Sequence, residues 1–155
     1  MITGEILNPA SIACRETAGS KKRVLEKISR LLAAPEGLNE IDVFDKLLER
    51  ERLGSTGLGQ GVAIPHCRLQ HAHSAHVALM TLQAPVNFEA RDGKPADIVF
   101  GLIVPEHCTE THLQILAKAA EMFSDAAFCA RLRASANNEQ LYELVSCWQP
   151  QSLSA

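Results

Sequence analysis

The amino-acid sequence predicts an α/β fold in which a mixed β-sheet carries helices on both faces. The first reason is the order of patterns along the 155 residues, which runs from two helical stretches through several strand-like runs and back to helices. The second is that strands and helices do not alternate strictly, as they would in a purely parallel sheet. The third is residues 96–104, which are almost all apolar and therefore predict a central strand covered on both faces.

Two helices are expected in the first third of the chain. Ser20 can cap the first, which ends at Pro35 and Gly37. Its apolar residues fall on one helical face: Val24, Leu25, Ile28, Leu31 and Leu32. Asn39 can cap the second, which ends before Gly54. Its apolar residues are Ile41, Phe44, Leu47 and Leu48.

Strands follow the second helix. Residues 62–64 predict a short buried strand that ends at Pro65, because proline cannot donate a hydrogen bond to a sheet. The sequence Asp92-Gly93 marks a turn, and Pro105 closes the strand that follows it. Three further runs predict strands, at residues 76–82, 86–88 and 96–104.

The last third of the chain is helical again. A helix begins at Thr109, and four apolar residues share one of its faces: Leu113, Leu116, Ala120 and Phe123. Two more helices are expected at about residues 126–134 and 139–148. The polar tail from Gln149 is expected to be frayed. Because no linker or internal repeat is present, residues 1–155 predict a single domain whose core spans about residues 15–148.

Composition excludes several classes of partner. A net charge of −3 and a pI near 6.1 argue against nucleic acid, which needs clustered lysines and arginines. No apolar run approaches the length of about 20 residues that a membrane span needs, so membrane insertion is not expected. The N-terminus lacks the pattern of a signal peptide. The five cysteines are odd in number and form no Cys-x-x-Cys pair, which predicts reduced thiols in a cytoplasmic protein.

A glycine-rich segment at residues 54–66 carries the strongest functional signal. Glycine has no side chain, so the backbone of this segment can approach a ligand closely. The segment contains four glycines: Gly54, Gly57, Gly59 and Gly61. His66 follows the short strand at residues 62–64 and is therefore expected at a strand end. A histidine beside a loop rich in backbone N–H groups can act as a nucleophile towards phosphorus.

Two nucleotide-binding interpretations of these glycines fail. A P-loop needs lysine and then serine or threonine after its second glycine, and Gln60 and Gly61 stand there instead. A dinucleotide-binding pattern needs Gly-x-Gly-x-x-Gly between a strand and a helix. The glycines here have a different spacing, follow a helix and lead into a strand.

Three side chains fit phosphoryl transfer to histidine. An imidazole has a pKa of about 6.5, so His66 is mostly neutral and nucleophilic near pH 7. Transfer depends mainly on positioning and on stabilising the charge of the phosphoryl oxygens, which Arg50 could do with its planar, permanently charged fork. His112 lies near a predicted helix N-terminus, where the helix dipole keeps an imidazole neutral and free N–H groups can assist.

The segment ending at His66 resembles the active-site segment of IIA proteins of the bacterial sugar phosphotransferase system. The fructose/mannitol class is most similar, and within it the nitrogen-regulatory branch. In that family the histidine of an Ala-(Ile/Val)-Pro-His motif becomes tele-phosphohistidine, which matches His66. The family's upstream arginine matches Arg50, and a Thr-His-Leu segment with the second active-site histidine matches His112. The resemblance covers roughly residues 15–145.

The resemblance implies a three-layer α/β/α sandwich and a phosphotransferase component. The chain would accept a phosphoryl group on His66 from a phosphohistidine carrier protein and would regulate partners, among them potassium-transport and sensor-kinase systems. Arg50, His112 and the N–H groups of the loop would hold the phosphoryl oxygens, with three glycines assigned to phosphate binding: Gly57, Gly59 and Gly61. No metal or other cofactor is required.

Alternatives stay open for the function and for single residues. A sugar-specific IIA component would pass the phosphoryl group to a IIB domain. A transfer-inactive binding module would keep only the fold, because Cys67 stands where the family usually has glycine and could narrow the phosphate pocket. Arg50 could simply interact with the helix dipole, and His112 could be a residue of the helix cap without a ligand. The histidine-rich residues 71–76 favour a solvated loop over a metal site.

Overall fold

The computed structural model describes residues 6–150, and within them six strands form one mixed sheet. The spatial order of the sheet is β1-β5-β6-β3-β2, and β4 also pairs with β6. This arrangement confirms the mixed sheet expected from the sequence. The strands are β1 (Leu7–Glu16), β2 (Gly57–Gly59), β3 (Val62–Ala63), β4 (His66–Leu69), β5 (His76–Val86) and β6 (Ala96–Pro105).

Strand β6 is the centre of the sheet. It pairs antiparallel with β5 on one edge, and on the other edge β3 and β4 pair with it in parallel, one after the other. Strand β1 pairs in parallel with β5, and β2 pairs antiparallel with β3. Nine of the ten residues of β6 are buried, as its apolar sequence predicts.

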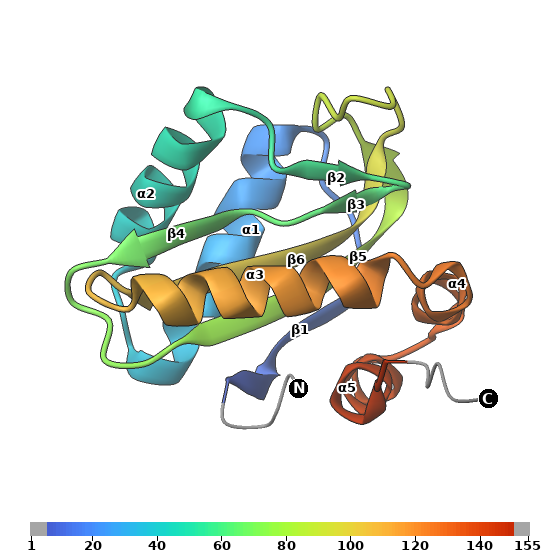
Figure 1. Ribbon diagram of the computed structural model, residues 1–155. Helices are drawn as coiled ribbons and strands as arrows, with labels where there is room; N and C mark the ends of the chain where they lie inside the picture. Colours follow the sequence, from blue (N-terminus) through green and yellow to red (C-terminus); the bar gives the residue numbers. More distant parts are fainter. Residues whose placement is uncertain (1–5, 151–155) are drawn as a thin grey trace.

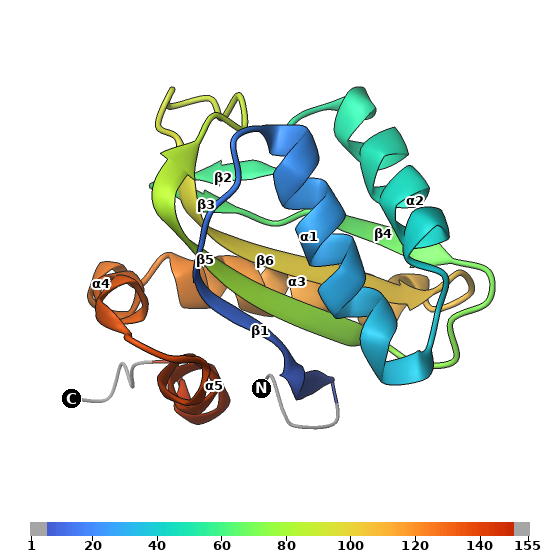
Figure 2. The ribbon, with the colours of Figure 1, turned by 180° about the vertical axis from the view of Figure 1, so that it is seen from behind.

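Helices cover both faces of this sheet. On one face lie α1 (Lys21–Ala33), the short 3-10 helix η1 (Ala34–Glu36) and α2 (Glu40–Leu53), as Figure 2 shows. On the other face lie α3 (Thr109–Phe123), α4 (Ala126–Ala134) and α5 (Asn138–Cys147), which are nearer the viewer in Figure 1. The fold is therefore the three-layer α/β/α sandwich that the family resemblance implies.

The sheet separates two hydrophobic cores. Successive residues of β6 point to opposite faces, so Phe100 and Leu102 join the core under α3, whereas Val99 and Ile103 join the core under α1 and α2. Between them Gly101 allows α1 to approach closely, because a Cβ at this position would lie 2.7 Å from Ile28 Cγ1.

Polar caps begin the helices where the sequence places them. Ser20 Oγ accepts a hydrogen bond from Arg23 N at 3.2 Å at the start of α1. Asn39 Oδ1 accepts one from Ile41 N at 2.9 Å at the start of α2. Both predicted caps are confirmed, since each satisfies a backbone N–H that has no partner within the helix.

The structure corrects several sequence-based expectations. Strand β1 was not anticipated, because Asn8 and Pro9 interrupt its apolar pattern, and Pro9 is tolerated there because β1 is an edge strand. The packed residues consequently begin at Leu7 rather than near residue 15. Strands β2 and β4 were also missed. The strand expected at residues 76–82 continues to Val86 as β5, and residues 87–88 of the strand expected at 86–88 lie outside it.

Two residues that the sequence places on the buried face of a helix are exposed instead. Ile41 is 65% exposed and Leu113 is 62% exposed, so neither belongs to the buried face of its helix. Helix α5 ends at Cys147, one residue before the predicted end. The frayed tail predicted from Gln149 lies largely outside the described residues. No helix of residues 6–150 combines the length and the apolar character that a membrane span needs.

Replacing Gly101 by alanine is expected to lower the free energy of unfolding by about 1–3 kcal/mol, because the new Cβ would overlap with Ile28 of α1. Gly19→Ala is the matched control, since an added Cβ there has nothing within 4 Å. We expect this control to change stability by less than about 0.5 kcal/mol. Urea unfolding measures both, and equal stabilities would contradict the close approach of α1 to β6.

Candidate active site

His66 is the first residue of β4, directly after Pro65. Its backbone lies opposite Leu102 of β6, and Leu102 N donates a hydrogen bond to the Pro65 carbonyl at 3.0 Å. Pro65 therefore takes part in the sheet through its carbonyl group, which accepts a hydrogen bond, and its missing N–H leaves no sheet hydrogen bond unmade here. The expectation that His66 follows a strand end needs correction, since the chain resumes pairing at this residue.

One hydrogen bond fixes the chemical state of the His66 ring. Nδ1 lies 2.7 Å from the carbonyl oxygen of Ile64. A carbonyl oxygen can only accept, so Nδ1 carries the proton. The other ring nitrogen, Nε2, then keeps its lone pair, which makes it the nucleophilic atom of the ring.

The structure brings His112 to His66 across 46 positions of sequence. His112 lies in the first turns of α3, which begins shortly after β6 ends, and the two ring centroids are 5.2 Å apart at an interplanar angle of 74°. The Nε2 atom of His112 is buried and has no hydrogen-bond partner within residues 6–150. An unpartnered polar atom beside a nucleophile can serve a ligand.

Both imidazoles are held in the neutral form. Burial lowers the pKa of His66, and the nearby charge of Arg50 lowers it further, against the opposing effect of the hydrogen bond to Ile64. Burial also lowers the pKa of His112 to about 4, and the charges of His66, Arg68 and Arg50 add to this effect. His66 is therefore available as a nucleophile at neutral pH.

Arg50 lies at the end of α2, beside the two histidines. Its Nη1 donates to the Gly54 carbonyl at 2.8 Å, an interaction typical of a cation at a helix C-terminus. The guanidinium has five N–H donors, so this bond leaves others for a ligand. The structural role considered for Arg50 and a phosphate-facing role are therefore compatible.

His66, His112 and Arg50 line one depression of about 440 Å³ between α2, β4 and the start of α3. Arg68 and Lys46 add two cations that the sequence analysis missed. Arg68 could have been found, because it lies two residues after His66 and residues at that spacing share a strand face. Two carboxylates, Glu49 and Glu106, also line the depression, and Lys46 Nζ lies 3.8 Å from Glu49 Oε2. The two arginines beside two neutral imidazoles are the groups that suit an anionic ligand.

Comparison with known proteins identifies the family of this chain. Residues 5–147 match the family described as phosphoenolpyruvate-dependent sugar phosphotransferase system, EIIA 2. The chain belongs to this family. Its members are components of a phosphotransferase system, as the resemblance implied.

Individual relatives agree with this assignment. The nitrogen regulatory protein of Pseudomonas aeruginosa is 46% identical over 144 residues, which cover 91% of this chain and 92% of that protein. The crystal structure of nitrogen regulatory protein IIA-Ntr from Neisseria meningitidis has a TM-score of 0.86 at 42% identity, covering 92% of this chain and 97% of that one. The IIA mannitol structure from Escherichia coli shares the fold, with a TM-score of 0.74 at 20% identity over 88% of this chain and 96% of that one.

The glycine-rich segment does not reach His66 in this IIA protein. Gln60 and Gly61 have φ values of 57° and 81° and form the two-residue turn between β2 and β3, which needs positive φ at both positions. Val62 faces Ile98 whereas His66 faces Leu102, so the turn lies more than about 13 Å along the sheet from His66. Gly57, Gly59 and Gly61 do not line the depression. We therefore do not propose a phosphate-binding role for these glycines.

Distant residues hold this turn in place. Asp92 Oδ2 accepts a hydrogen bond from Gln60 N at 2.8 Å, and Arg133 Nη2 donates one to the Gln60 carbonyl at 2.8 Å. Arg133 also forms an ion pair with Asp97 at 2.9 Å. The glycines are thus explained by the geometry of a turn that is anchored to β6 and α4.

The Cys67 side chain is buried on the face of β4 that packs against α1 and α2. It is 6% exposed and packs in the core under α1 and α2. Burial raises the pKa of the thiol to about 12, so it stays protonated and is a poor nucleophile. Cys67 is among the residues that line the depression around His66, but its buried side chain belongs to the core beneath it.

A buried ion pair holds the segment between Arg50 and His66. The Glu51 carboxylate lies 2.8 Å from Lys21 Nζ and accepts a hydrogen bond from Thr56 N at 2.9 Å. The Thr56 carbonyl in turn accepts a hydrogen bond from Ile64 N at 2.9 Å. Lys21 is therefore a structural residue beneath the site.

The histidine-rich residues 71–76 end in a structural histidine. His76 is 7% exposed, and its Nε2 lies 2.7 Å from Glu36 Oε1. Burial alone would raise the pKa of Glu36, but hydrogen bonds from His73 N, His76 and Ser74 outweigh it and lower this pKa to about 2. His76 is thus not part of a solvated loop. Within residues 6–150 no cluster of three or more potential metal ligands occurs.

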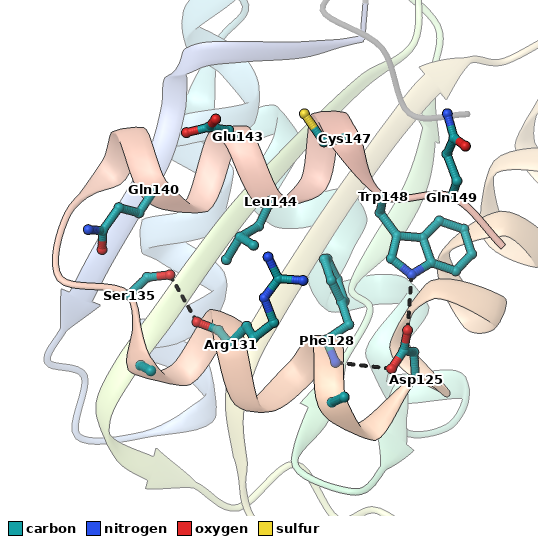
Figure 3. A pocket seen from close by; sticks show the side chains of 12 residues that line it. Asp125, Phe128, Arg131, Ser135, Gln140, Glu143, Leu144, Cys147, Trp148 and Gln149 are labelled. Carbon is teal, nitrogen blue, oxygen red and sulfur yellow. Dashed lines mark hydrogen bonds between the residues drawn. The ribbon is translucent and has the colours of Figure 1, made fainter. Parts of the chain in front are cut away.

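A larger depression of about 750 Å³ lies between α4 and α5 (Figure 3). Its lining includes the apolar side chains of Phe128, Leu144 and Trp148, and Trp148 Nε1 donates to Asp125 Oδ2 at 3.4 Å. It shares no residue with the depression around His66. Although it is larger, it lacks the pair of neutral histidines, and we therefore place the candidate active site at His66.

Lys21→Met is expected to lower the free energy of unfolding by about 2–4 kcal/mol, because it leaves the buried Glu51 carboxylate without its cation. Lys22→Met is the matched control. Lys22 is the exposed neighbour, and its replacement is expected to change stability by less than about 0.5 kcal/mol. Urea unfolding distinguishes the two, and equal effects would show that the ion pair does not support the site.

His112 is expected to titrate near pH 4. The unfolded chain has an ordinary histidine pKa of about 6.5, so it binds more protons than the folded protein between these values. His112 therefore stabilises the fold fully above about pH 6.5, and this contribution is lost as the pH falls towards about 4. NMR titration of the His112 C2 proton measures the pKa, and a midpoint near 6.5 would contradict the buried, cation-flanked position.

Proposed function

We propose that this IIA protein accepts a phosphoryl group on Nε2 of His66 from a phosphohistidine carrier protein. The observation that carries the proposal is the hydrogen bond from Nδ1 to the Ile64 carbonyl. It leaves the Nε2 lone pair in the depression beside Arg50 and His112. Phosphorylation at Nε2 gives the tele isomer.

The transfer step needs no group beyond the two proteins. The lone pair of His66 Nε2 forms the new N–P bond, and the electron pair of the donor's N–P bond returns to the donor's ring nitrogen. The proton on His66 Nδ1 stays in place, where the Ile64 carbonyl stabilises the positive charge that the ring gains. Arg50 and His112 would bind phosphoryl oxygens in the loose transition state.

We further propose a regulatory role for the phosphorylated state. Support comes from nitrogen regulatory proteins at 40–46% identity, of which this chain spans 87–92%. Phosphorylation adds about −1.5 to −2 charges. This charge would appear next to Leu53 and Leu113, which are 83% and 62% exposed, and would change the surface that a partner meets. Potassium-transport and sensor-kinase systems are the proposed partners, and the cytoplasm, which keeps its five free cysteines reduced, is the proposed location.

Incubation with phosphoenolpyruvate, enzyme I and a phosphocarrier protein is expected to add one acid-labile phosphoryl group, measured by intact mass. His66→Ala is expected to abolish the gain, because it removes the imidazole whose Nε2 lone pair is left free by the Nδ1 hydrogen bond to the Ile64 carbonyl. NMR of the product is expected to show phosphorus on Nε2. Absence of any gain with carrier proteins of both the nitrogen and the sugar branch would overturn the proposal and favour a transfer-inactive binding module.

Arg50→Gln is expected to slow phosphorylation by about 10²-fold, the usual effect of removing one group that stabilises a developing oxyanion. Arg23→Gln removes the same charge from an exposed residue of α1 that does not line the depression, and it serves as the control. Stopped single-turnover reactions measure both rates. An Arg50→Gln rate equal to that of the control would mean that Arg50 serves only the end of α2.

A further inference from the structure

Arg68 is a second arginine on the phosphate-accepting side of the site. It lies two residues after His66 in β4, and alternation along a strand places the two side chains on the same face. Its backbone faces Val104 of β6, and its exposed side chain lines the depression that contains His66 and His112. No role has so far been assigned to it.

Thr109 holds the Arg68 guanidinium. Arg68 Nη1 donates a hydrogen bond to Thr109 Oγ1 at 3.0 Å, and Thr109 is the first residue of α3. His112 follows three positions later, which places it on the same side of the helix as Thr109. One hydrogen bond therefore ties the side chain of Arg68 to the turn of helix that carries the second histidine.

The charge of Arg68 is not neutralised by the protein. All ion pairs within residues 6–150 involve other cations, so the two carboxylates that line the depression, Glu49 and Glu106, lie beyond 4.0 Å from it. The hydrogen bond to Thr109 occupies only one of its five N–H donors. Arg68 thus retains both its charge and its donors for an anion.

Arg50 and Arg68 reach the histidines from different elements. Arg50 comes from the end of α2, and Arg68 comes from β4 on the side of α3. Both charges act on His112, whose pKa they lower. A phosphoryl group on His66 Nε2 would have three equatorial oxygens, and the depression offers it two guanidinium groups and the unpartnered Nε2 of His112.

We propose that Arg68 binds an oxygen of the phosphoryl group carried by His66, while Arg50 binds the group from the side of α2. Thr109 is the positioning residue that orients the Arg68 guanidinium. This inference rests on the proposed phosphorylation of His66 and adds a second phosphate-binding arginine to it.

The kinetic test compares Arg68→Gln, Arg68→Lys and Thr109→Val with the wild type in single-turnover phosphorylation by the carrier protein. Arg68→Gln is expected to lower the maximal rate 10- to 100-fold with little change in the half-saturating carrier concentration, because the contact is made to the transferring group. Arg68→Lys is expected to restore part of the rate, since it keeps the charge but loses the fork. Thr109→Val is expected to lower the rate by less than Arg68→Gln.

Arg91→Gln is the matched control, because it removes one exposed arginine charge at a residue that does not line the depression. If Arg68→Gln raises only the half-saturating carrier concentration, Arg68 is a docking charge and the inference is overturned. A maximal rate equal to that of Arg91→Gln would also overturn it. If the wild-type protein takes up no phosphoryl group, the proposed function itself fails, which is a separate result.

The unphosphorylated protein gives an independent readout. Arg68→Gln is expected to raise the pKa of His112 measured by NMR titration, because it removes one of the cations that disfavour imidazolium. Arg91→Gln is expected to leave this pKa unchanged. A folded Arg68→Gln variant with an unchanged His112 pKa would show that the guanidinium does not lie at the site, whatever the outcome of the kinetics.

Discussion

The double-sided burial of β6 is the constraint on which the rest of the structure depends. Because both of its faces are covered, its two edges must be paired along their length, and β3 and β4 together satisfy one of them. The same pairing sets His66 opposite Leu102. The end of β6 at Pro105 then sends the chain into α3, which returns His112 to His66. Fold and site are consequences of one buried strand.

The charges around His66 are arranged to suit the phosphoryl group that we propose it accepts. Burial and the neighbouring arginines keep both imidazoles uncharged, so the positive charge at the histidines lies on Arg50 and Arg68 and not on the nucleophile. A doubly negative phosphoryl group would reverse this balance. Such preorganisation removes the need for large rearrangement during transfer, since the stabilising groups are already in place. The same excess of positive charge would make the unmodified and the phosphorylated surfaces differ strongly to any partner.

Sequence reasoning succeeded where a local signal had one physical meaning. The caps Ser20 and Asn39 and the apolar run of β6 each followed from neighbouring residues. It failed where contacts between residues distant in the sequence determine the position or the role of a side chain. Lys21 looks solvated until Glu51 is seen beside it, and the glycines look like a phosphate loop until their turn is seen bound to Arg133. Strand β1, with Pro9 inside it, forms only because β5 offers an edge.

The pairing of β1 with β5 affects how the chain folds during synthesis. Leu7 faces Val77, and Glu16 faces Leu82, so β1 leaves the ribosome before its partner and stays unpaired until β5 has been synthesised. Parallel pairing over such a separation is slow, because a long loop must close before the contacts form. Strand β1 therefore stays unpaired while α1, α2 and the strands β2 to β4 are synthesised. Until the two strands pair, the edge of β5 is uncovered, and nascent chains carry an aggregation-prone surface that the finished protein does not show.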